Sequence, residues 1–96
     1  MLFIVTLTHS PENCWMRGEN RETGREWVAT MDERATKHGV ELHGAYVTPN
    51  EHTFHLVVEA PELAAVTAFL GPPLLTDHEG DVMPVISLER ANIFAD

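Results

Sequence analysis

Cysteine is almost absent from this chain of 96 residues, in which Cys14 carries the one thiol. No disulfide bond can therefore form within the chain, and this composition is typical of proteins from a reducing compartment. The first residues, Met1 to Val5, carry no basic side chain, and polar residues begin at Thr6. This beginning is unlike a secretory signal peptide. We therefore expect a cytoplasmic protein.

Positive charge is also scarce, because 6 Lys and Arg residues stand against 15 Asp and Glu residues, for a formal net charge of -9. The basic residues form no patch in the sequence and are Arg17, Arg21, Arg25, Arg34, Lys37 and Arg90. An acidic surface repels phosphate groups, so we expect neither nucleic acid nor an anionic membrane as a partner. No apolar run approaches the roughly 20 residues that span a bilayer.

The familiar catalytic and nucleotide-binding patterns are missing as well. The chain has no glycine-rich phosphate loop and no signature of paired catalytic carboxylates. We find no internal repeat or linker, and the length suits one domain, residues 1–96. A domain of this size stabilises itself only modestly, which favours an oligomer that buries more surface.

Alternation of apolar and polar residues predicts four strands, and apolar residues at three- and four-residue spacing predict two helices. The strands are residues 2–9, 40–47, 53–59 and 81–88. After a short turn from Pro11, one helix runs from about Glu22 to a stop at His38-Gly39. The other begins at Pro61 and ends at Gly71-Pro72-Pro73, with a loop over 74–80 and a last short helix over 89–94. Pro84 cannot donate a ladder hydrogen bond, so the fourth strand should lie at an edge.

The element order β-α-β-β-α-β predicts an α+β fold, the ferredoxin-like plait with a four-stranded antiparallel sheet. Right-handed crossovers place the first and third strands in the centre and the second and fourth at the edges. Both long helices then cover one face of the sheet and leave the other face bare.

This topology brings three loops to one edge of the sheet. The end of the first strand carries His9 and leads to Cys14, the 48–52 hairpin carries His52, and the loop before the fourth strand carries His78. The alternation of each strand turns His9 and His52 toward the helices. Because thiolate and imidazole are favoured by zinc and copper, we predict a metal site of these four residues. If the metal is copper, Met16 is a candidate weak axial ligand.

Taken singly, these residues have simpler interpretations. Cys14 then serves as a small buried apolar residue, His9 ends a strand, and His52 and His78 are solvated. If no metal binds, a reactive thiol with a histidine partner is the next hypothesis.

Two aromatic residues are candidates for a pocket. Trp15 follows Cys14 directly, and Tyr46 has the alternation of a core residue near the same edge.

A second histidine pair, His43 and His55, should face each other across the hairpin on the bare side of the sheet. Thr6, Thr8, Ala45, Val47, Thr53 and Val57 are expected on the same face. Such a mixed surface favours a homodimer formed sheet to sheet. The pair would bind a metal, loosen the dimer when protonated, or make an ordinary polar contact.

Three segments carry a resemblance to known proteins, namely residues 7–15 (LTHSPENCW), 49–54 (PNEHTF) and 71–75 (GPPLL). They resemble a group of short uncharacterised microbial proteins, whose pattern is similar to the dimeric α+β-barrel superfamily. That superfamily includes muconolactone isomerases, YCII-like proteins and antibiotic-biosynthesis monooxygenases. The resemblance implies a dimeric barrel, and no catalytic residue carries over because its members differ in chemistry.

The resemblance also implies two alternatives to a metal-binding protein. One is a metal-free small-molecule enzyme, isomerase-like or monooxygenase-like, in which a pocket between sheet and helices holds an apolar substrate. His9, His52 or His78 would then act as the general base. The other is a non-catalytic module whose function is dimerisation.

Overall fold

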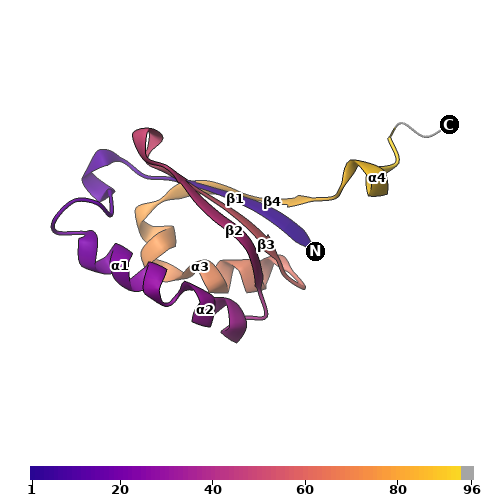
Figure 1. Ribbon diagram of the computed structural model, residues 1–96, viewed down its shortest axis with the longest axis horizontal. Helices are drawn as coiled ribbons and strands as arrows, with labels where there is room; N and C mark the ends of the chain where they lie inside the picture. Colours follow the sequence, from indigo (N-terminus) through magenta and orange to yellow (C-terminus); the bar gives the residue numbers. More distant parts are fainter. Residues whose placement is uncertain (94–96) are drawn as a thin grey trace.

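The structure, a computed structural model, describes residues 1–93 and consists of one four-stranded sheet with helices over one face (Figure 1). The strands are β1 (Leu2–Thr8), β2 (Glu41–Thr48), β3 (Thr53–Glu59) and β4 (Glu79–Val85). The α-helices are α1 (Arg21–Ala29), α2 (Met31–Lys37), α3 (Leu63–Asp77) and α4 (Leu88–Ala91). Two short 3-10 turns are η1 (Pro11–Asn13) and η2 (Pro49–Glu51). Within residues 1–93, no helix is long and apolar enough to cross a membrane.

The strand order in the sheet is β2-β3-β1-β4, and each neighbouring pair is antiparallel. The predicted plait is confirmed, with the first and third strands in the centre. Pro84 lies in the edge strand β4, as its missing N–H group requires. Beyond this strand the chain continues past the sheet to α4 (Figure 1). The predicted last helix is thus shorter than expected, and residue 94 lies outside the described residues.

The predicted first helix is divided in two at Thr30. Its hydroxyl donates to the carbonyl oxygen of Glu26 at 2.9 Å, and its backbone N–H also bonds to that oxygen. A threonine that bonds back to the preceding turn disturbs regular helix geometry, and here α1 ends at Ala29 and α2 begins at Met31. The predicted stop at His38-Gly39 is confirmed, with Gly39 at φ 69°.

The loop predicted over 74–80 is wrong, because helical structure resumes after Gly71. Gly71 has φ 79° and ψ 164°, which breaks α3 into two segments. Pro72 and Pro73 then occupy the first turn of the second segment, where proline needs no N–H partner. The helix therefore runs on to Asp77, and His78 comes directly between this helix and β4.

Strand β2 contains a β-bulge that sequence alternation could not reveal. Leu42 pairs with Val58 and Gly44 with Val57, so His43 is an extra residue in the ladder. Every side chain beyond the bulge changes face. Tyr46 therefore pairs with His55 and is 64% exposed, which corrects its predicted core orientation. Conversely, Ala45 and Val47 pair with Leu56 and Phe54, on the helix side rather than on the bare face.

The core lies between the sheet and the helices. Its largest fully buried side chains come from β1, β3 and α3 and are Phe3, Phe69, Leu7, Leu70, Leu74, Val5, Val58 and Val66. Trp27 of α1 is also buried, and its indole N–H donates to the Leu70 carbonyl oxygen at 2.8 Å. This hydrogen bond connects α1 to the kink in α3, because Leu70 directly precedes Gly71. The core thus fixes the ends of β1, β3 and α3 relative to one another.

Candidate metal centre

His9 follows β1 and is buried, with 8% of its surface exposed. Its backbone N–H donates to the carbonyl oxygen of His52 at 3.1 Å, which ties the end of β1 to the hairpin. Within residues 1–93, both ring nitrogens of His9 are buried without a hydrogen-bond partner. Leaving polar atoms buried and unpaired costs free energy, so a bound metal ion or a buried water molecule would account for the position of this imidazole.

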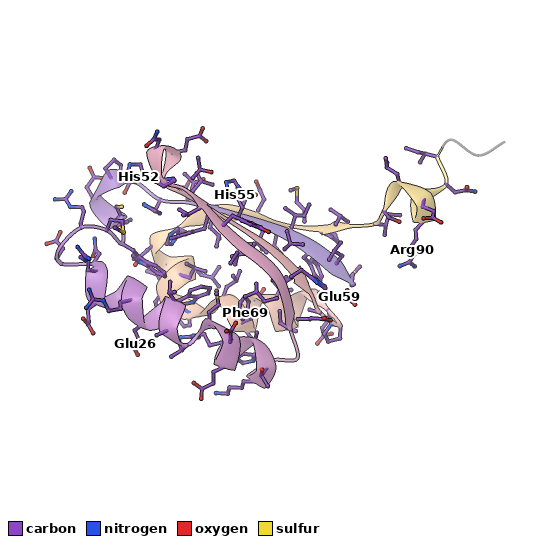
Figure 2. All side chains as sticks on the ribbon, in the orientation of Figure 1. Glu26, His52, His55, Glu59, Phe69 and Arg90 are labelled. Carbon is purple, nitrogen blue, oxygen red and sulfur yellow. The ribbon has the colours of Figure 1, made fainter. Side chains whose placement is uncertain are left out.

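His52 sits between η2 and β3 in a left-handed backbone conformation, with φ 52° and ψ 44°. Few residues other than glycine adopt this region, and such strain is common at functional sites. The strain places its side chain beside His9, with ring centroids 5.2 Å apart. Figure 2 shows His52 at the end of the sheet opposite to Glu59.

Cys14 ends the η1 turn and carries a half-buried free thiol. The backbone N–H of Met16 donates to its Sγ atom at 3.5 Å. The Asn20 side chain steadies this loop by donating to the carbonyl oxygens of Glu12 at 2.9 Å and of Cys14 at 3.3 Å. The thiol is therefore held in place by local hydrogen bonds rather than by core packing.

The ligand atoms of His9, Cys14 and His52 all lie within 4.8 Å of one another. Zinc binds such atoms at about 2.0–2.3 Å, so neighbouring ligands in a tetrahedral site are about 3.3–3.8 Å apart. The observed spacing needs only small side-chain adjustments to reach those distances. This His/Cys/His group could hold a metal ion.

His78, the fourth predicted ligand, lies beside this group but is not part of it. Its ring packs edge-on against that of His9, with centroids 4.8 Å apart. Its Nδ1–H donates to the Leu74 carbonyl oxygen at 2.8 Å, which leaves the lone pair on Nε2. In the described part of the chain, Nε2 is buried with no hydrogen-bond partner. The histidine is therefore oriented by the second segment of α3, residues 72–77, which the sequence did not predict.

Aromatic side chains surround His78. Its ring centroid lies 5.1 Å from that of Trp15 and 5.4 Å from that of Phe54. The Trp15 indole N–H donates to Asp77 Oδ2 at 3.2 Å, so this carboxylate bonds to the indole rather than to the adjacent His78. Sequence reasoning missed the role of Phe54, although its alternation placed it on the helix side of β3.

Burial keeps both inner histidines neutral. Desolvation is the main cause that lowers the pKa of His9, and repulsion from His78 and His52 lowers it further, against a smaller opposite effect of Asp77. Desolvation also lowers the pKa of His78, partly offset by its bond to Leu74 and by Asp77. Neutral imidazole is the form that binds metals or accepts a proton.

The remaining predicted site residues lie elsewhere. Met16 is 74% exposed. His43 and His55 do not face each other, because the bulge at His43 shifts the register and pairs His55 with Tyr46. The predicted pair is therefore wrong, and with it the proposal that facing imidazolium groups open a dimer. His55 Nε2 bonds to Thr48 Oγ1 at 2.8 Å.

His43 instead meets Glu59, with Nε2 3.3 Å from Oε1, at the far end of the sheet from His52. Glu41 completes this exposed cluster, whose ligand atoms also lie within 4.8 Å of one another. Exposed acidic groups gather in this way without binding an ion, so the cluster carries no assignment.

Comparison with known families identifies the family of this chain. A model described as a domain of unknown function, DUF3303, matches residues 1–94, and the chain therefore belongs to this family. No curated protein matches the sequence. The family assignment covers nearly the whole chain and names no chemistry. The relation to the dimeric α+β-barrel superfamily stays a prediction.

Proposed function

We propose that this DUF3303 chain is a metal-binding protein whose centre consists of His9, Cys14 and His52. One observation carries the proposal: the buried imidazole of His9 has no hydrogen-bond partner for either ring nitrogen within residues 1–93, beside a thiol and a second imidazole. A bound ion would satisfy one of these nitrogens. It would also link the end of β1, the η1 turn and the hairpin, a useful gain for a small core.

The donor set favours zinc over copper. One thiolate and two imidazoles suit zinc, which keeps a fourth position for water when three protein residues bind it. The same donors occur in copper sites, where a weak axial thioether usually completes the geometry. Met16 was the candidate for that position, and its side chain is largely exposed. Zinc is therefore the metal that the arrangement supports best.

Elemental analysis of protein purified without a metal-chelating tag tests the proposal. We expect zinc, or failing that copper, at close to one ion per chain. Cys14→Ser and His52→Gln should each lose the ion and lower the melting temperature of metal-loaded protein, with little effect on metal-free protein. His38→Gln, at the end of α2, is the matched control and should bind normally. Equimolar binding that survives both site variants would refute this centre.

A second candidate function, a metal-free enzyme with His78 as general base, has one observation in its favour. The bond from Nδ1–H to Leu74 leaves the Nε2 lone pair of a buried, neutral imidazole available to accept a proton. Nitrogen-detected NMR of metal-free protein should show the Nδ1–H tautomer at neutral pH. The Nε2–H tautomer would exclude this role.

A further inference from the structure

A pocket of about 220 Å³ lies beneath the edge strand β2, between the sheet and helices α1 and α2. Its deep wall is made by the buried side chains of Trp15, Trp27 and Leu56. Its rim is made by Val28 and Val47, which are both exposed. The pocket thus has a buried apolar floor and an opening to solvent between α1 and β2.

The bulge in β2 creates this space. Without the extra residue His43, the alternation of β2 would turn Tyr46 toward the helices. With it, Ala45 takes that place, opposite Leu56, and Tyr46 stands at the rim. A methyl group thus replaces a phenol ring in the layer between sheet and helices. Bulges that redirect side chains are frequent next to functional sites.

The pocket offers no free indole donor to a polar ligand. The Trp15 N–H donates to Asp77, and the Trp27 N–H donates to the Leu70 carbonyl oxygen. The other side chains that line the deep part are aliphatic or aromatic, with the thioether of Met31. Such a lining favours an apolar guest, and methionine adapts to guests of different shape.

The volume indicates the size of the guest. An engineered apolar cavity of about 150 Å³ in another protein stays dry and takes up benzene. A pocket of about 220 Å³ with an open rim therefore fits one six-membered ring with a small substituent.

The pocket also shares a wall with the candidate metal centre. Trp15 and Phe54 line the pocket on one side, and on the other side both rings pack against His78. Phe54 also packs against His9, with centroids 5.9 Å apart. A molecule in the pocket would therefore contact the aromatic rings that hold the histidines in place.

From the bulge, the lining and this shared wall, we infer that the pocket beneath β2 binds a small apolar molecule of about one ring. The binding requires no metal. If the proposed metal centre is correct, this pocket places an organic substrate next to it, and that further step rests on the proposed function.

Titration of the full chain with toluene tests the inference. We expect saturable binding that shifts the NMR signals of both indole N–H groups, because Trp15 and Trp27 both line the deep wall of the pocket. Ala45→Leu fills the space and should weaken toluene binding by about tenfold or more. Val47→Phe narrows the rim and should slow or weaken toluene binding. It replaces Ala45→Leu as the test variant if Ala45→Leu does not fold.

The matched control is Ala68→Leu, the same change on the exposed side of α3, which should leave toluene binding unaltered. The titration is repeated on Cys14→Ser protein treated with a chelator, where binding should persist even if the metal proposal fails. An absence of saturation up to the solubility of toluene would overturn the inference. Equal binding by wild type and both pocket variants would also overturn it.

Discussion

At the scale of single residues, His9 combines burial with ring nitrogens that have no hydrogen-bond partner among residues 1–93. A core position next to Leu7 and Phe54 would suit an apolar side chain, whereas His9 brings two buried nitrogens without partners among residues 1–93. Unpaired buried polar groups cost about 1–3 kcal/mol each. A residue that destabilises its own fold in this way is typical of functional sites.

We therefore predict that His9→Leu raises the free energy of unfolding of metal-free protein by about 1 kcal/mol, because it removes unpaired polar atoms at similar volume. The same change should abolish metal binding. Urea unfolding of chelator-treated protein measures the first effect, and His38→Leu, at the C-cap of α2, should change neither. A clear loss of stability on His9→Leu would indicate that its nitrogens are satisfied in solution.

The lowered pKa values of His9 and His78 predict how stability depends on pH. In the unfolded chain these histidines titrate near 6.5, so between that value and the lower folded pKa the unfolded state binds more protons. Stability should be full above about pH 6.5 and fall as the pH decreases through the folded pKa values. Cys14, His52 and Asp77 face the same cluster, and Asp77 moderates the decrease.

Urea unfolding of metal-free protein between pH 7.5 and 5 measures this decrease. The His9→Leu variant should show a shallower pH dependence over the same range, because it removes one of the two histidines. An identical slope for the variant and wild type would show that His9 titrates normally.

At the scale of elements, the kink at Gly71 decides where His78 lies. Gly71 has φ 79° and ψ 164°, and a Cβ atom there would lie 2.8 Å from Nη1 of Arg34. Only glycine adopts this backbone region readily, and strain of this kind costs about 1–3 kcal/mol. The helical segment from Pro72 to Asp77 depends on this turn, and it supplies the Leu74 carbonyl group that orients His78.

We predict that Gly71→Ala lowers the free energy of unfolding by about 1–3 kcal/mol and broadens the NMR signals of His78. Gly39→Ala is an informative comparison, because Gly39 also has a positive φ but no atom within 4 Å of a new Cβ. Gly39→Ala should therefore lower the free energy of unfolding by less than Gly71→Ala does. Gly18→Ala, in open space, should be close to neutral. Chemical denaturation of the three variants measures their free energies of unfolding and so ranks them. If Gly71→Ala is as stable as wild type, this account of the kink is contradicted.

At the scale of the whole molecule, helices α1, α2 and α3 cover one face of the sheet and leave the other face bare among residues 1–93 (Figure 1). Ile4 lies between Val57 and Met83 on this face, and both Ile4 and Met83 are exposed. Tyr46, turned outward by the bulge, adds to the same apolar area. The exposed apolar area supports the expected sheet-to-sheet homodimer. The predicted histidine pair is not part of that interface, because His43 and His55 do not face each other.

We predict that the protein is dimeric at tens of micromolar, on the order of weak-interface affinities, and that Ile4→Glu makes it monomeric. A carboxylate at the centre of the face would meet its own copy across the two-fold axis. Sedimentation velocity measures the state, and Leu63→Glu, on exposed α3 surface, is the control that should stay dimeric. A monomeric wild type at this concentration would exclude the dimer.

Patterns in the sequence are enough to predict the plait and the edge of the sheet at which His9, Cys14 and His52 lie. Strand alternation, the stops at Gly39 and Gly71, and the edge position of Pro84 depend on neighbouring residues alone. Right-handed crossovers then leave one arrangement of strands, so the ends of β1, the hairpin and the start of β4 must meet. For this reason, the topology alone predicts that His9, Cys14 and His52 lie close together.

Beyond an irregularity, the face of the sheet to which a side chain points depends on long-range packing and could not be predicted from the sequence. Counting alternate residues assumes an unbroken ladder, and one extra residue at His43 reversed Tyr46 and Ala45 together. Likewise, Pro72 and Pro73 end a helix locally, yet after the turn at Gly71 they begin the segment that buries His78. Bulges and kinks of this kind depend on partners distant in the sequence, which no local pattern contains. Strand β3 pairs with the bulged strand, and the Trp27 indole donates to Leu70 beside the kink.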